Sequence, residues 1–287
     1  MVRYIRAAND VLKVDHDGGP GKGKYLNDVF WDYEEDEAAH GVTYTIPYGI
    51  ITIRSNAFLE CESIETINMP DTVFDIRNAA FAMCVNLKTV NFSKNLVDIG
   101  ISTFSGCTGL KDIKFPDSLE FIGHGAFYEC KGIRYITIPR GVKQIDKYAF
   151  GKCTNLRSLE FESLDTRLVQ HVFEDCTSIR TIKFPNLTLD VSYTDGVSNF
   201  TEAIQRCMYI IRDRYHKGVL SLLMDGFQFA LDLIFELAKK DAVADQFIQD
   251  NKDKLLEYAS EYNRTDIKSR LLDMMQDDFN NGGSLRL

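Results

Sequence analysis

The stretch AFYECKGIRYITIP (Ala126–Pro139) recurs in variant form every 23 residues through the middle of this 287-residue chain. Two positions carry the period most strictly, an aromatic one and a thiol three residues after it. They are Phe58, Phe81, Phe104, Phe127, Phe150 and Phe173, with Cys61, Cys84, Cys107, Cys130, Cys153 and Cys176. A fixed period of this length is typical of a solenoid, in which each repeat is one turn stacked on the last.

The spacing inside the repeat predicts how each turn folds. Ile136 and Ile138 are two residues apart, so both side chains point to the same face of a short strand. Pro139 ends that strand because proline cannot donate to a strand ladder. A second apolar pair, such as Leu119 and Ile122, brings the chain back over the core. The repeats therefore predict a solenoid of about six to seven turns spaced about 4.8 Å apart. Together with the helical C-terminal segment described below, they predict a mixed α and β fold class.

The pattern A-F-x-x-C-x-x-L-x-x-I-x-x-P resembles the leucine-rich repeats of the BspA-like type, which occur in bacterial surface proteins and in some eukaryotic parasites. The resemblance covers residues 42–187 and is carried nearly intact by Ala126–Pro139. It implies a protein-interaction surface built on a rigid stack.

The column of cysteines has three interpretations. Equivalent side chains of a solenoid point in parallel, which is poor geometry for a disulfide between turns. No C-x2-C pair occurs and no His shares the period, which disfavours a metal site. We expect the thiols, and Cys207 with them, to pack as small apolar groups in the core. Buried thiols suit a reducing compartment or a well-sealed core.

The segments outside the repeat predict an N-terminal cap, a helical domain and a C-terminal tail. Residues 1–41 hold a Gly-rich loop and are expected to cap the first turn through Phe30 and Trp31. Residues 188–279 are expected to form an α-helical domain, either a cap or a second binding domain, and residues 280–287 a disordered tail. Apolar stripes of helical period predict helices near 200–211, 227–238, 243–250, 255–262 and 267–275.

Composition excludes some functions and suggests a location. The net charge of −9 disfavours general nucleic-acid binding, and no apolar run is long enough for a membrane span. Met1–Val14 has no apolar signal region. We therefore expect a cytoplasmic protein; a secreted or cell-surface location is the alternative if a signal peptide has been removed.

Motifs for catalysis are weak. Gly18–Lys24 matches G-x4-G-K of a phosphate-binding loop, but Tyr25 stands where Ser or Thr is needed, and no βαβ unit surrounds it. Asp15-His16-Asp17 is the one local cluster with a histidine, and we interpret it as a surface loop. The other histidines, His40, His124, His171 and His216, are scattered. The sequence predicts no catalytic residues, no cofactor and no metal, and therefore no enzyme.

A column of bases is the strongest surface signal. It consists of Lys88, Lys111, Arg134, Arg157 and Arg180, one in each of five consecutive repeats. Tyr135 and Lys114 lie in the neighbouring polar columns. One interpretation is a solvated edge that keeps the sheet soluble. The other is a binding surface for a protein partner with an acidic surface.

These patterns predict a non-enzymatic protein-interaction module or scaffold. A surface adhesin is the alternative favoured by the resemblance, and nucleotide binding by Gly18–Lys24 is a second alternative. Neither the partner nor the oligomeric state follows from the sequence.

Overall fold

The computed structural model describes residues 25–26, 41–191, 200–213, 216, 218–225, 227–239 and 242–282. The predicted N-terminal cap with Phe30 and Trp31 lies outside these residues, as do Asp15–Asp17, Gly18–Lys24 and residues 283–287. The described chain forms two compact units. The first holds the repeats up to Asn186 and the start of the first helix. The second holds a strand from Leu187 and the remaining helical residues.

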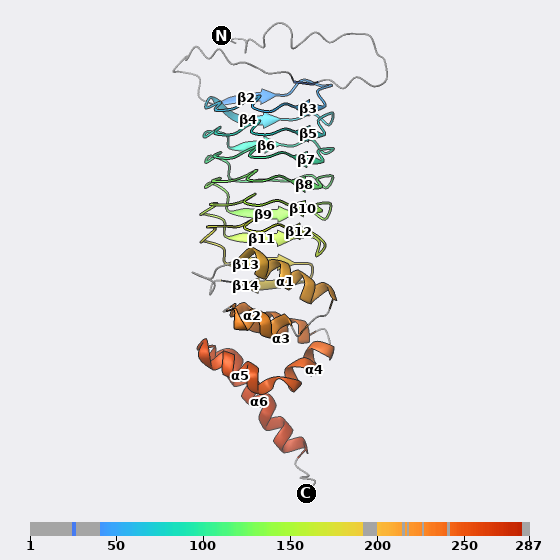
Figure 1. Cartoon of the computed structure of the whole chain (residues 1–287), viewed down its shortest axis with the longest axis vertical. Helices are drawn as coiled ribbons and strands as arrows, with labels where there is room; N and C mark the ends of the chain where they lie inside the picture. The colour runs from blue at the N-terminus through green and yellow to red at the C-terminus, as the bar shows by residue number, and fades with distance from the viewer. Residues whose placement is uncertain are drawn as a thin grey trace. The chain divides into compact units, whose positions relative to one another are not determined.

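The first unit is the predicted solenoid, and its short strands stack in two parallel sheets (Figure 1). Sheet A contains β1 (Tyr25–Leu26), β3 (Thr52–Ile53), β5 (Asp75–Ile76), β7 (Asp98–Ile99), β8 (Phe121–Ile122), β10 (Gln144–Ile145) and β12 (Arg167–Leu168). Sheet B contains β2 (Val42–Thr45), β4 (Ile64–Asn68), β6 (Thr89–Asn91), β9 (Tyr135–Ile138), β11 (Ser158–Phe161) and β13 (Thr181–Phe184).

Strand pairing follows the sequence period. Thr66 pairs with Thr89 and Asp75 with Asp98, each 23 residues further along. Strands β9 and β13 end directly before Pro139 and Pro185, as expected. Sheet B is interrupted where the strand expected near Ile113 is reduced to single bridges made by Asp112. Aspartate is disfavoured in strands, which accounts for the weak pairing there.

The phenylalanine column forms the centre of the core. Phe58, Phe81, Phe104, Phe127 and Phe150 are fully buried, and Phe173 is 3% exposed. Successive rings stack nearly parallel with centroids 4.9–5.8 Å apart. Offset stacking of this kind adds to the burial of apolar area, so the column holds neighbouring turns in register.

Each turn reverses direction through two residues with positive φ, two positions before and two positions after the phenylalanine. Around Phe127 these are Gly125 (φ 60°) and Glu129 (φ 58°), and around Phe150 they are Tyr148 (φ 57°) and Lys152 (φ 55°). Most of these positions are not glycine, although non-glycine residues rarely adopt this conformation. The reversal segments are held by bonds between turns, such as the Phe127 amide donating to the Ala149 carbonyl at 2.7 Å.

The second unit contains β14 (Leu187–Asp190) and helices of which five fall close to the predicted ranges; the short helix at Gly218–Met224 was not among them. The helices are α1 (Phe200–Asp213), which begins in the first unit, α2 (Gly218–Met224), α3 (Phe229–Ala238), α4 (Ala242–Asp250), α5 (Lys252–Glu261) and α6 (Thr265–Gly282). Within this unit α3 contacts α2, α4 and β14, and α5 contacts α6.

Two boundaries differ from the sequence prediction. The segment predicted as wholly helical from residue 188 begins with strand β14, in which Leu189 is buried between exposed Thr188 and Asp190. This alternation has the period of a strand. The helix predicted to end before residue 280 continues to Gly282, a residue type common at helix ends.

A buried arginine joins helices of the second unit. The Arg264 guanidinium donates to both carboxylate oxygens of Asp232 at 2.8 and 2.7 Å, and also to Asp266. The hydrogen bond from Arg264 lowers the pKa of Asp266. Bidentate pairing of this kind fixes geometry, so the cluster connects α3 to the turn before α6.

Candidate functional site

The five bases predicted as a partner-binding column lie one above another. Each stands directly before the strand position of its turn on sheet B. Backbone bonds connect the last three members: the Arg157 amide donates to the Arg134 carbonyl at 2.8 Å, and the Arg180 amide donates to the Arg157 carbonyl at 2.9 Å. All five side chains are exposed: Lys88, Lys111, Arg134, Arg157 and Arg180.

The structure divides these bases into two classes. The Lys88 ammonium lies 2.7 Å from the carboxylate of Glu65, which occupies the same position in the preceding turn. Arg180 donates from Nη1 to the carbonyls of Thr177 and Ile179. Within residues 41–191, the side chains of the three central bases form neither an ion pair nor a hydrogen bond. These bases are Lys111, Arg134 and Arg157. The centre of the column is therefore uncompensated positive charge.

The flanking residues add an aromatic side chain and mixed charge. Tyr135 is 58% exposed and pairs through its backbone with Asp112 and Ser158 in the adjacent turns. Lys114 is also exposed, two residues beyond Asp112. The candidate surface thus offers bases, the exposed Tyr135 ring and the exposed acid Asp112.

A ladder of amides lies beside this surface at its N-terminal end. The Asn91 side-chain amide donates to Asn68 Oδ1 at 2.7 Å, and that of Asn68 donates to Thr45 Oγ1 at 3.1 Å. The sequence shows the polar column but does not show that its members bond to one another. These bonds fix the side chains before any partner arrives.

The cysteine column has a role that the period alone did not reveal. Five thiols donate to the carbonyl of the phenylalanine 26 residues earlier, in the preceding turn. For Cys130 the acceptor is the Phe104 carbonyl, at 3.1 Å. Burial raises the pKa of the Cys130 and Cys207 thiols. The described cysteines are free, as expected, and from Cys84 onward the column is buried.

Cys61 departs from the expected burial, since it is only half-buried. The thiol column begins there, so the side chain is covered less completely than its successors. Partial burial, with a smaller contribution from the Cys84 thiol, still raises the pKa of Cys61 to about 12. Thiols that stay protonated are poor nucleophiles, which disfavours a catalytic role for Cys61, Cys130 and Cys207.

Two of the scattered histidines, His124 and His171, contact the same tyrosine, Tyr148. The rings of His124 and Tyr148 contact edge to face at 5.8 Å, and Tyr148 stacks on His171 at 5.6 Å. His171 Nδ1 lies 2.9 Å from Glu174. His216 is buried in the second unit, whereas His16 and His40 lie outside the described residues. Among the described residues, His, Cys, Asp and Glu form no group that could hold a metal ion.

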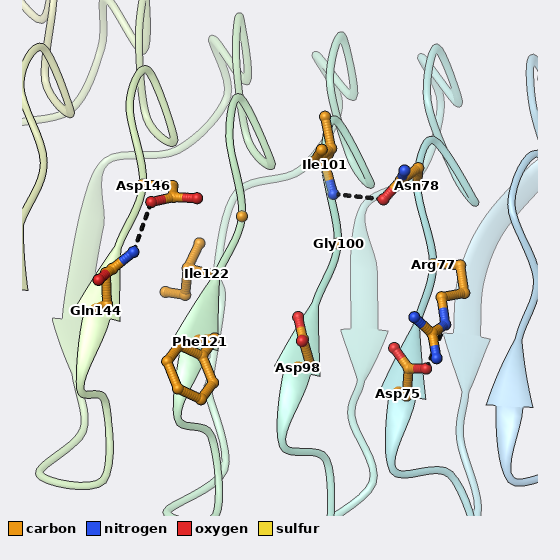
Figure 2. Close-up of a pocket in the computed structure, with 11 residues that line it drawn as sticks. Asp75, Arg77, Asn78, Asp98, Gly100, Ile101, Phe121, Ile122, Gln144 and Asp146 are labelled. Carbon is orange, nitrogen blue, oxygen red and sulfur yellow. Dashed lines mark hydrogen bonds and ion pairs between the residues drawn. The ribbon is translucent and has the colours of Figure 1, made fainter.

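A hollow that the sequence did not predict lies on sheet A, at strands β5, β7, β8 and β10. Figure 2 shows its acidic residues Asp75, Asp98 and Asp146, with Phe121 beside them. Its volume is about 270 Å³. The available signal was the run of two small residues, Gly100 and Gly123, at one position of consecutive repeats.

In the part of the chain that the structure describes, no helix combines the length and apolar character needed to cross a bilayer.

Comparison with known proteins agrees with the geometry. The model of the BspA type leucine rich repeat region matches residues 42–121 and 75–194 and counts six copies. No curated protein matches the chain.

Solved structures similar to this chain include three bacterial proteins. A T. pallidum leucine rich repeat protein is 27% identical, with a TM-score of 0.46 over 51% of this chain and 70% of its own. A leucine rich cell surface protein from Faecalibacterium prausnitzii is 24% identical, with a TM-score of 0.38 over 50% of this chain and 32% of its own. A leucine-rich repeat protein from Eubacterium ventriosum is 20% identical, with a TM-score of 0.44 over 50% of this chain and 39% of its own.

The two matched ranges together span residues 42–194, just over half of the 287 residues, so this chain belongs to the family of proteins with BspA-type leucine-rich repeats.

Proposed function

We propose that the protein is a non-enzymatic interaction module whose base column binds an acidic surface on a protein partner. The observation that carries the proposal is the set of three stacked, exposed bases whose side chains form no ion pair or hydrogen bond within residues 41–191, Lys111, Arg134 and Arg157. Tyr135 beside them supplies exposed aromatic area of the kind enriched in interfaces. A rigid stack presents these groups in fixed positions, which lowers the entropy lost on binding.

Electrostatics support this proposal over a role in solubility. Like charges one strand spacing apart, about 4.8 Å, repel one another, and an acidic partner would relieve that repulsion. Charged side chains that block strand addition are needed on the terminal strands of a sheet. The base column instead runs across the strands, from turn to turn, with its members at the start of the strand or bridge in successive turns rather than along one outermost strand.

The test is a capture experiment with matched charge variants. The binding variant carries Lys111→Glu, Arg134→Glu and Arg157→Glu. The control variant carries the same change of net charge at exposed or half-exposed lysines of other columns, Lys94→Glu, Lys131→Glu and Lys152→Glu. Circular dichroism verifies that both variants are folded. We expect partners captured from the source lysate by the wild type and the control to be lost by the binding variant, and to be released as salt is raised.

Retention of the same partners by the binding variant would refute the role of the column and leave it as a solvated surface. A peptide of alternating Glu and Ala gives a second readout with a defined probe. It should compete with the captured partner for the wild type in a salt-dependent way. Failure of this peptide to compete would show that negative charge is not what the column recognises.

The cytoplasmic location and the nucleotide-binding alternative remain predictions. Buried free thiols are compatible with a reducing compartment. Fractionation of source cells tests the location, because recovery mainly outside the cell would favour the adhesin alternative. Calorimetric titration with ATP tests Gly18–Lys24, and heat of binding would revive the nucleotide alternative.

A further inference from the structure

The hollow on sheet A originates in the repeat itself. One position of consecutive turns is occupied by Arg77, Gly100, Gly123 and Asp146, so two turns in a row have no side chain between a base and an acid. A Cβ atom added at Gly100 would lie 2.8 Å from the Ile76 carbonyl oxygen, and one added at Gly123 would lie 2.7 Å from a backbone atom of Gly100. Because the turns approach so closely, the fold requires glycine there and the hollow is a fixed feature.

Apolar side chains form part of its lining. Phe121 is 40% exposed and Ile101 is 47% exposed, although both belong to a fold that buries most of its large apolar residues. In Figure 2 the Phe121 ring lies between the Asp98 side of the hollow and the Gln144 side. A ligand that entered here would therefore meet an aromatic ring and carboxylates together.

The charge of the hollow is negative. Three carboxylates line it, and the one base among the lining residues, Arg77, places its Nε 2.6 Å from Asp75. Asp146 accepts a hydrogen bond from the Gln144 amide at 2.8 Å. Within residues 41–191, the Asp98 carboxylate has neither a hydrogen bond nor an ion pair.

The surroundings of these carboxylates disfavour their charge. Removal from water raises the pKa of Asp98, and Asp146 adds to this effect while Arg77 opposes it. Removal from water likewise raises the pKa of Asp75, against the opposing influence of Arg77. A cation bound in the hollow would stabilise the ionised form of both groups.

We propose that the hollow binds an arginine side chain presented by a protein partner. The flat guanidinium can lie against the Phe121 ring and direct its donors to Asp98 and Asp146, which is the combination of contacts that arginine makes best. A metal ion fits less well, because the described acids form no group suited to one. This surface belongs to sheet A, whereas the base column stands on sheet B. The module then has two faces with opposite charge preference, one for an acidic partner and one for a basic partner.

The experiment is a titration of the full chain followed by amide chemical shifts. The probes are N-acetyl-arginine methylamide, the corresponding lysine compound and the uncharged norleucine compound. We expect the arginine probe to give saturable shifts at the Gly100 and Gly123 amides, with affinity in the millimolar range expected for one side chain. The norleucine probe should give none.

Matched variants assign the binding to the hollow. Asp98→Asn keeps the shape of the side chain and should weaken arginine binding by about two- to fivefold. Asp117→Asn removes an exposed acid elsewhere and should leave the affinity unchanged. The base-column variant of the preceding subsection should bind the arginine probe as the wild type does, so failure of one proposal is distinguishable from failure of the other.

Three results would overturn the inference. The first is the absence of saturable shifts in a protein whose melting temperature shows it to be folded. The second is an affinity that Asp98→Asn leaves unchanged. The third is an equal response to the lysine probe, which would mean that a flat guanidinium is not what the hollow selects.

Discussion

Replacement of Phe127 by alanine tests the central claim about the fold, that the aromatic column holds the turns together. The Phe127 ring is fully buried and stacks on two others, Phe104 at 5.2 Å and Phe150 at 5.3 Å. Phe115 contacts it edge to face at 5.5 Å. The variant Phe127→Ala therefore removes contacts on three sides.

The expected cost follows from these contacts. Loss of the buried apolar area costs about 2 kcal/mol, and each stacked pair contributes about 1 kcal/mol. The cavity that remains adds to this, so Phe127→Ala should lower the free energy of unfolding by about 4–5 kcal/mol, high in the range for core phenylalanines. Phe173 has one stacked neighbour, at 5.8 Å. Phe173→Ala should therefore cost less, about 3 kcal/mol.

The assay is equilibrium unfolding in guanidinium chloride followed by circular dichroism. Phe121→Ala provides the control, since its ring is 40% exposed and its loss should cost less than about 1 kcal/mol. Because each turn contacts only its neighbours, the Phe127 variant should lose several turns in one transition. A cost below about 1 kcal/mol for Phe127→Ala, or a larger cost for Phe173→Ala, would refute the account of the core.

Three further predictions concern a thiol, two glycines and a carboxylate. Cys130→Ala removes the bond to the Phe104 carbonyl and should lower the free energy of unfolding by about 1–2 kcal/mol in urea titrations, whereas no loss would mean that the thiol bond is inert. Gly125→Ala should lower the free energy of unfolding by about 1 kcal/mol, the cost of positive φ, because the added Cβ makes only ordinary contacts. Gly123→Ala should cost at least about 2 kcal/mol in the same titration, because its Cβ would lie 2.7 Å from a backbone atom of Gly100. Equal costs for the two variants would contradict the close approach of the turns. Asp98→Asn should raise the melting temperature at neutral pH, because an acid with a raised folded pKa destabilises the fold above that pKa, and the gain should vanish as pH falls below the unfolded pKa of 3.8; a gain that persisted at low pH would not come from ionisation.

The periodic features of this chain were predictable from its sequence, because the fixed spacing of equivalent residues shows which positions align when the turns stack. The phenylalanine core, the strand ends at Pro139 and Pro185 and the predicted helices all follow from spacing. The stacking of the base column follows as well, since side chains 23 residues apart must align once the turns are stacked.

Other features depend on distances between turns, which spacing does not report. The thiol bonds join residues 26 apart, so their donor and acceptor belong to different positions of the repeat. The positive φ angles at Glu129 and Lys152 could not be predicted from the residue types, because neither glutamate nor lysine favours that conformation. The hollow depends on how closely Gly123 approaches Gly100. Strand β14 was missed because its four residues precede a long helical pattern.

The pairing of strand residues with counterparts 23 positions away, as at Thr66 with Thr89, has a consequence for how such a chain can evolve. Loss or duplication of one whole repeat in the gene would rejoin equivalent positions, so hydrogen bonds, ring stack and thiol bonds would form again across the new junction. Each such event would change the length of both faces by one strand spacing, about 4.8 Å. The length of the solenoid can therefore change by one turn in a single genetic step while the bonds between turns are kept.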